Sequence, residues 1–149
     1  GTISGGRFSV TFDNTSTPKI TELTGTVFTF TIPHFNFSGF FQPVDNPPTS
    51  NDTNAGRAVP VKFSLNGNQG LNIFEADYPK SQAINCDTIS LDILEETVTA
   101  GSSSLSYDAS TDRYIYVWKT AKTWADSCRQ LVVKLSDGSS HVANFKFKK

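Results

Sequence analysis

The chain has 149 residues, with 13 basic and 14 acidic side chains and a formal net charge of −1. This length fits one domain with its own hydrophobic core, with or without an appended segment. Because the charges nearly balance and are scattered along the chain, composition argues against nucleic acid and anionic membranes as partners.

The chain has the residue usage of an antiparallel two-sheet protein, rich in Ser, Thr and Phe. Strict apolar alternation predicts strands over residues 7–12 and 25–32, with a short strand at 20–23 between them. Another strand is expected at residues 34–41. The stretch 42–56 holds three prolines and repeated Asn, Asp and Thr, so it is predicted to be a loop or linker and an internal boundary.

The next predicted strand, residues 57–65, contains a proline at position 60. Proline cannot donate to a sheet ladder, so Pro60 places this strand at an edge or where a strand crosses between sheets. Lys62 points outward there and would discourage edge-to-edge pairing. The polar stretch 66–70 ("NGNQG") is predicted to be a turn, with a ligand-binding loop as the alternative. The residues on the expected core face are Val59, Val61, Phe63 and Leu65.

The C-terminal half alternates short strands and turns. The pair Asp137-Gly138 is a two-residue hairpin signal, and Asp108 and Asp112 are expected to cap another tight connection. A short helical turn is expected within residues 121–128. Such spacing predicts an all-β, immunoglobulin-like antiparallel sandwich, with a β-barrel as the alternative. The further strands are expected at residues 88–94, 95–100, 113–120, 129–135 and 141–147.

Two cysteines, Cys86 and Cys128, occur without the spacing of a zinc site. They predict a disulfide and an oxidising, extracellular compartment, the alternative being two buried thiols. Without a signal peptide or a membrane-length apolar run, the chain is expected to be a mature or excised exported fragment. Asn14, Asn36 and Asn51 match the short N-glycosylation pattern.

Several separated blocks agree in order with one family. They are "GFFQPVDNPP", "VPVKFSLNGNQGLNIF", "YPKSQ", "YVWKT", "CRQLVVKLSDG" and "NFKFK". Residues 39–149 therefore resemble the PxKF domain, found at or near the C-terminus of secreted bacterial proteins. The resemblance implies an exported, disulfide-bonded accessory domain without catalytic residues, serving attachment, spacing or surface retention. Residues 1–38 lie outside it and are expected to end a preceding module or to add strands to the same sandwich.

Catalytic constellations are missing from the sequence. His34 and His141 stand in no metal-ligand spacing, and there is no Gly-x-Ser-x-Gly elbow or phosphate loop. Glu95 and Glu96 are adjacent on a predicted strand and would point to opposite faces, so they cannot serve one glycosidic bond. We expect no enzyme activity and no cofactor.

One Asx-rich stretch could supply oxygen ligands for calcium. Calcium takes six to eight oxygens, and no EF-hand spacing is present. Turn caps that bond their own backbone are the favoured interpretation, so no metal site is expected. The residues in question are Asp45, Asn46, Asn51 and Asp52.

Aromatic side chains are the remaining candidates for ligand contact. The strand 113–120 carries Tyr114, Tyr116 and Trp118 on one face and aliphatic side chains on the other. Exposed, the three rings would stack on sugars; buried, Trp118 would be the large core residue that sandwiches place against a disulfide. We favour the core for Trp118 and expect Trp124, on a loop beside Cys128, to be the exposed contact.

These observations predict a non-catalytic accessory or adhesion module of a secreted or cell-surface bacterial protein. Its expected partner is a polysaccharide or a protein. The alternative is a structural spacer or self-assembling domain that pairs through edge strands. An enzyme is the least favoured reading.

Overall fold

The computed structural model describes residues 2–4, 7–9, 34–87, 97–99 and 104–149. The chain divides into two compact units, residues 1–31 and 32–149. In the first unit, β1 (Thr2–Ser4) pairs antiparallel with β2 (Arg7–Ser9). Strand β2 covers the start of the predicted strand 7–12. The predicted strands at 20–23, 25–32 and 88–94 lie outside the described residues.

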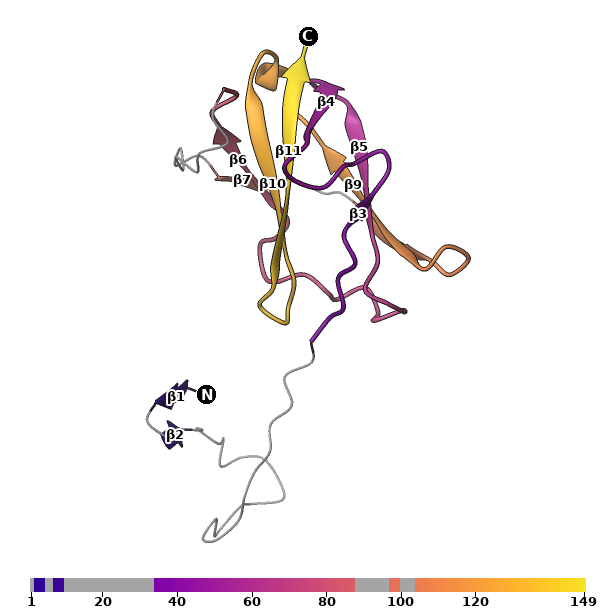
Figure 1. Ribbon diagram of the computed structural model, residues 1–149, viewed down its shortest axis with the longest axis vertical. Helices are drawn as coiled ribbons and strands as arrows, with labels where there is room; N and C mark the ends of the chain where they lie inside the picture. The colour runs from indigo at the N-terminus through magenta and orange to yellow at the C-terminus, as the bar shows by residue number, and fades with distance from the viewer. Residues whose placement is uncertain (1, 5–6, 10–33, 88–96, 100–103) are drawn as a thin grey trace, which may run out of the picture. The chain divides into compact units, whose positions relative to one another are not determined.

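The second unit is a sandwich of two sheets (Figure 1). One sheet has the order β4 (Ser50–Asn54), β11 (Ser140–Lys148), β10 (Cys128–Lys134), β6 (Lys80–Ile84), β7 (Thr97–Thr99). The other has the order β3 (Phe40–Phe41), β5 (Ala58–Phe63), β9 (Arg113–Lys119), β8 (Leu105–Asp108). Neighbouring strands are antiparallel except β4 and β11, which are parallel. The predicted all-β sandwich is confirmed.

Alternation along the central strands produces the core. In β5 and β9 every second side chain is buried. The inward-facing side chains of β10 and β11 are buried as well. Phe63 is fully buried and its ring lies 5.6 Å from that of Tyr114. Trp118 is also fully buried, with its ring centroid 5.0 Å from that of Phe145 on the opposite sheet. Aromatic rings from both sheets therefore fill the space between them.

Pro60 lies at a position of β5 where the missing N–H removes no hydrogen bond between β5 and β9. Thr120 N–H donates to the Arg57 carbonyl (3.3 Å) at the start of the β5–β9 ladder. Bonded pairs recur at every second residue, so Pro60 and Val117 face each other in a pair that exchanges no hydrogen bonds. The proline nitrogen faces the β3 side, and β3 ends before it reaches Pro60. The prediction of an edge strand is wrong, because β5 lies between β3 and β9. Pro60 is accommodated because the described part of β3 pairs with β5 only at Lys62 and Phe63.

Two boundaries differ from the sequence prediction. The stretch 42–56 is not all loop, because it contains β4; this polar strand is held by parallel pairing with β11 rather than by apolar alternation. The strand expected at 34–41 is reduced to β3. Gly39, at φ 104°, interrupts it. The Asn46 side chain accepts a hydrogen bond from Phe40 N–H and donates one to the Phe40 carbonyl. Strands β6 and β8 were not predicted.

Turn chemistry follows the sequence closely. The β10–β11 hairpin forms at Asp137-Gly138, but its loop has three residues: Gly138 N–H donates to the Leu135 carbonyl (2.9 Å), and Gly138 has φ 87°. The expected helical turn is the 3₁₀ turn η1 (Lys122–Trp124). In the part of the chain described, no helix is long and apolar enough to cross a bilayer.

Cys86 and Cys128 form the predicted disulfide, with 5.2 Å between their Cα atoms. The bond ties the chain just after β6 to the start of β10, two neighbours in one sheet. Cys128 alternates with Arg129 and Leu131, so it lies on the face of this sheet that points away from Trp118. The disulfide therefore reinforces one sheet and does not join the two.

Replacing Phe63 by Ala should destabilise the fold by about 3 to 5 kcal/mol, because a fully buried ring leaves a cavity among aromatic neighbours. Urea unfolding measures the change. Lys62→Ala, on the opposite face of β5, is the control and should change stability by about 0.5 kcal/mol or less. Equal stability of the Phe63 variant and the parent protein would show that the faces of β5 are reversed.

Replacing both cysteines by Ser should lower the free energy of unfolding by about 4 kcal/mol, because the bond closes a loop with a sequence separation of 42. Denaturant unfolding of the variant beside the parent measures this. The pairing itself is checked by alkylating native protein without reductant; two modified thiols in the mass spectrum would contradict it.

Candidate functional site

The aromatic face of β9 points into the core. Tyr114 and Trp118 are fully buried and Tyr116 is 3% exposed, whereas the aliphatic residues between them are half-buried on the outer face. The Tyr114 hydroxyl donates to the Gly70 carbonyl (2.9 Å) and accepts from Gln69 N–H (2.6 Å). This confirms that Trp118 is a core residue, but its expected packing against the disulfide is wrong, because Cys128 lies on the outer face of the opposite sheet. The three rings offer no stacking surface to a ligand.

The prediction that Trp124 is an exposed contact is wrong. Its side chain is only 7% exposed, and its ring lies 5.7 Å from Trp118 and 5.5 Å from Phe147. The Arg129 guanidinium lies 4.1 Å from the ring centroid, a cation–π contact. The 3₁₀ turn folds Trp124 over the end of the core, so it closes the sandwich rather than facing solvent.

The calcium candidates make local hydrogen bonds. Asn51 accepts from Asp45 N–H (2.8 Å) and donates to the Asp45 carbonyl (3.1 Å), while Asn46 bonds the backbone of Phe40. Asp52 pairs with Lys148 (2.7 Å). Asn51 is buried, so its amide is not available for glycosylation in the folded chain. The described residues hold no group of three His, Cys, Asp or Glu side chains arranged for a metal.

His141 lies in a cluster with Ser139 and Asp137. The hydrogen bonds of this cluster are not arranged as in a catalytic triad. Ser139 Oγ donates to Asp137 (2.6 Å), and His141 Nε2 lies 3.2 Å from the same Oγ. The serine proton already points at the carboxylate, so the imidazole is not placed to remove it. The His141 ring stacks on Phe37 (3.6 Å between centroids), and burial lowers its pKa. The cluster is built to hold structure.

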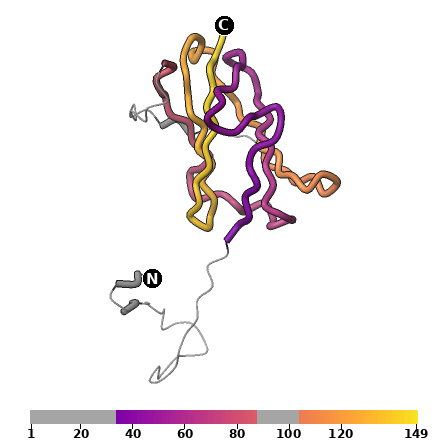
Figure 2. Tube along the Cα trace, in the orientation of Figure 1, coloured from indigo at the N-terminus to yellow at the C-terminus, as the bar shows by residue number. Residues whose placement is uncertain are grey.

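An open groove of about 710 Å³ lies at the end of the sandwich where the chain enters it. Residues 34–38 and Phe41 form one wall, and Ser64, Asn66 and residues 111–113 form the other. Ser139 of the β10–β11 turn and His141 of β11 also contribute. Figure 2 shows the β8–β9 hairpin, which supplies residues 111–113, projecting from the body of the sandwich. None of these residues belongs to the set of aromatic candidates chosen from the sequence.

Asp137 holds the first wall. Its carboxylate, 1% exposed, accepts from Phe35 N–H (2.8 Å) and lies 3.3 Å from His34 Nδ1. Burial by itself would raise the pKa of Asp137, but the hydrogen bonds from Ser139 and Phe35 outweigh it and keep that pKa below its usual value. Further along, Ser38 N–H donates to the Ser64 carbonyl (3.1 Å). The extended segment 34–38 is thus pinned at both ends.

Asp112 holds the second wall. It accepts hydrogen bonds from the Tyr107 hydroxyl (2.7 Å), Ser64 Oγ (3.1 Å) and Gly67 N–H (3.0 Å). The Tyr107 bond is the main cause of the lowered pKa of Asp112, and the same bond raises the pKa of Tyr107 to about 12. Both Asp112 and Asn66 adopt positive φ, 52° and 58°, at the turns that this carboxylate joins.

Apolar and polar groups meet in the groove. Phe41 is half-buried on the outer face of its sheet, with the Arg113 guanidinium 4.1 Å from its ring centroid. Phe35 and Phe37 are also half-buried, and the side chains that alternate with them, His34, Asn36 and Ser38, are exposed. Half-exposed rings beside fixed hydrogen-bonding groups suit recognition of a ligand that has both apolar and polar faces.

The structure is a disulfide-bonded β-sandwich with an open groove at one end. No family model, no curated protein and no solved structure matches this chain.

The sequence does not reveal the groove, because four distant stretches of chain form it. A partial signal was present: Phe alternates with polar residues in "HFNFSGFF", as in a wall with one face on the protein and one in solvent. The sequence predicts that Asp112 caps its own turn, whereas in the structure its carboxylate also accepts hydrogen bonds from Ser64 and Gly67 of another turn. Nothing in the local sequence indicates that contact.

Replacing Asp137 by Asn should cost about 2 kcal/mol at neutral pH, because charge-assisted hydrogen bonds to the groove wall are weakened. Since the pKa of Asp137 is lowered from 3.8, its contribution is present above that value and lost as pH falls through the folded pKa. The stability difference between parent and variant, measured by urea unfolding across pH, should therefore shrink below about pH 4.

Asp77→Asn is the matched control, because Asp77 is exposed and none of the hydrogen bonds seen among the described residues involves its side chain. It should leave stability nearly unchanged at every pH. If Asp137→Asn lowers the free energy of unfolding by the same amount from neutral to acidic pH, the role given to the carboxylate is contradicted.

Proposed function

We propose that this sandwich is a non-catalytic binding module that attaches an exported protein to a glycan through the groove beside β3. The observation that carries the proposal is the Phe41 ring, held by Arg113 at the border of an open groove with fixed polar groups. The expected context is the one that the PxKF resemblance implies, an accessory domain of a secreted bacterial protein.

A glycan suits the chemistry of this groove. Sugar rings have apolar C–H faces rimmed by hydroxyls, so they stack on aromatic rings and hydrogen-bond to side chains at the ring edge. Phe41 supplies the ring, and Arg113, Asn66 and Asn36 supply donors and acceptors around it. The walls are fixed by Asp112 and Asp137, so little ordering is needed when a ligand binds.

A non-catalytic role agrees with how the polar residues are used. The carboxylates of Asp112 and Asp137 accept hydrogen bonds from backbone and hydroxyl groups of the protein. The Ser139 hydroxyl donates to Asp137. The disulfide supports an oxidising compartment.

Phe41→Ala should weaken glycan binding by about 5- to 150-fold, the loss expected for one stacked ring worth about 1 to 3 kcal/mol. Affinity electrophoresis against soluble β-glucan, xylan and glycol chitin, with peptidoglycan sedimentation, measures it. Leu71→Ala removes the large exposed apolar side chain outside the groove and is the control, which should bind like the parent.

Two outcomes would overturn the proposal. One is that the parent protein is retarded by none of the polysaccharides and does not sediment with peptidoglycan. The other is that a glycan binds but Phe41→Ala binds it as tightly as the Leu71 variant does.

A second function, a spacer that assembles through its strands, is favoured by one feature of the four-stranded sheet. Among the strands that the structure describes, β8 is the last in that sheet and pairs with β9 alone. An open edge of this kind can add a strand from a neighbouring molecule. Sedimentation velocity over a hundredfold range of concentration tests it: growing oligomers would support the spacer, and a constant monomer would exclude it.

A further inference from the structure

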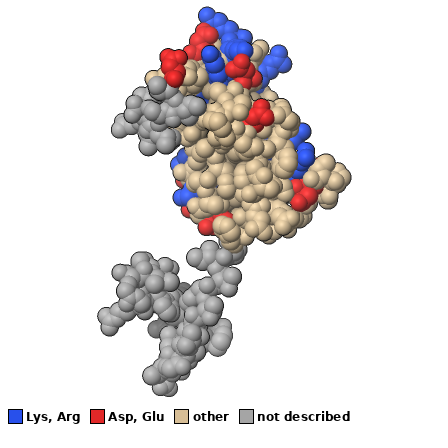
Figure 3. All heavy atoms as spheres, viewed as in Figure 1, with Lys and Arg blue, Asp and Glu red and all other residues tan. Residues whose placement is uncertain are grey.

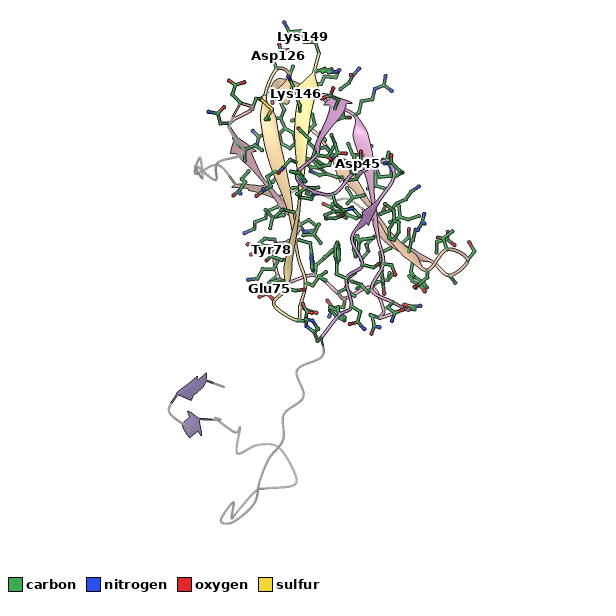
Figure 4. The ribbon with its side chains drawn as sticks, in the orientation of Figure 1. Asp45, Glu75, Tyr78, Asp126, Lys146 and Lys149 are labelled. Carbon is green, nitrogen blue, oxygen red and sulfur yellow. A yellow bond between two sulfur atoms is a disulfide. The ribbon has the colours of Figure 1, made fainter. Side chains whose placement is uncertain are left out.

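Basic side chains gather at the end of the sandwich opposite the groove, where β11 finishes. Figure 3 shows Lys and Arg concentrated there, with a few acidic residues among them, while the middle of that face is largely uncharged. Lys146 and Lys149 are labelled at this end in Figure 4. We call it the basic pole. Its members, all exposed, are Arg57, Lys119, Lys122, Lys146, Lys148 and Lys149.

The fold brings these residues together from separate parts of the chain. Lys119 at the end of β9 is opposite Ala58 at the start of β5, directly after Arg57. Ala55 N–H donates to the Lys148 carbonyl (2.9 Å), which joins the β4–β5 turn to the end of β11. The sequence shows balanced, scattered charges, and only the topology concentrates the basic ones.

Acidic neighbours neutralise only part of the pole. Asp52 pairs with Lys148 (2.7 Å) and Asp126 with Lys149 (3.2 Å). The hydrogen bond from Lys148 is the main cause of the lowered pKa of Asp52. Four basic side chains form no ion pair with any described residue, so the pole keeps an excess of positive charge. They are Arg57, Lys119, Lys122 and Lys146.

Lys122, one of the four, has its stem close to the backbone of the β4–β5 turn at Gly56. Gly56 has φ 82° in the β4–β5 turn, and a Cβ added there would lie 2.5 Å from Lys122 Cγ. The stem of Lys122 therefore lies against a backbone that only glycine leaves open. This contact involves the base of the Lys122 side chain, and the residue as a whole is exposed.

We propose that the basic pole is a second binding site, independent of the groove, for an anionic polysaccharide that carries uronate or sulfate groups. Repeated anions along a polymer match several separated cations, and such binding weakens steeply with salt because counterions are released. The site lies at the far end of β5 from the groove, so one module could hold two chains, or two parts of one chain.

Other polyanions fit the pole less well. Single-stranded nucleic acid is held by exposed aromatic rings beside cations, and Trp124, near this end, is buried. Membrane surfaces are held by apolar side chains that enter the lipid. Among the described residues, the large exposed apolar side chain is Leu71, which follows the turn at the opposite end of β5.

The test compares two triple variants with the same change in net charge. Lys119→Gln, Lys122→Gln and Lys146→Gln together remove charge from the pole. The control combines Lys62→Gln, Lys80→Gln and Lys134→Gln, of which the last two flank Tyr78 away from the pole. The probes are heparin and polygalacturonate at 50 mM NaCl, with neutral dextran as the uncharged reference. The expected result is about tenfold or more weaker binding for the pole variant, with a smaller salt dependence, and much less change for the control.

Equal losses in the two triple variants would overturn the proposal, since they would show an effect of net charge alone. Binding of the Phe41→Ala variant, which lacks the stacking ring of the groove, to dextran as tightly as to heparin and polygalacturonate would also overturn it. So would tighter binding, at the same salt, to a DNA oligonucleotide or to vesicles containing phosphatidylserine. Phe41→Ala should bind heparin like the parent, so failure at the pole and failure at the groove are told apart.

Discussion

Burial of the aromatic faces of β5 and β9 against β10 and β11 is the constraint on which the other features depend. Phe63, Tyr114 and Trp118 occupy alternate positions and must all point inward, so their sequence neighbours must point outward. This alternation places Arg113 on the outer face of the sheet, where it reaches past β5 to the ring of Phe41 in β3. The groove therefore begins where the core ends, and a one-residue slip of β9 would remove both.

The carboxylates of Asp137 and Asp112 fix the two walls of the groove. Asp137 pins the incoming segment to the β10–β11 hairpin through Phe35, and Asp112 joins the β8–β9 hairpin to the turn after β5. Because each accepts from several donors, the two walls of the groove are fixed without a metal or a bound ligand. The disulfide plays a separate part, since it reinforces the five-stranded sheet on its outer face.

The sequence predicts the parts of this fold where apolar alternation is strong, including the inward face of β5 and the hairpin at Asp137. Both faces of β9 are apolar, so there the sequence only favours the core position of Trp118. It fails for β4, whose residues "SNDTN" show no alternation and become a strand only because β11 offers a partner. It also fails for Trp124, because the residue that helps to bury it, Phe147, comes from the distant end of the chain. The groove and the basic pole could not be foreseen for the same reason, as tertiary pairing assembles them from separate segments.

The measurement that tests this account most directly is an amide NMR titration of the protein with cellohexaose, xylohexaose and chitohexaose. If the groove binds glycans, the amide signals that shift with at least one of these sugars should belong to residues 34–41, 64–67 and 111–113. Shifts confined to other surfaces, such as the outer face of β10 and β6, or no shifts with any sugar, would contradict the account.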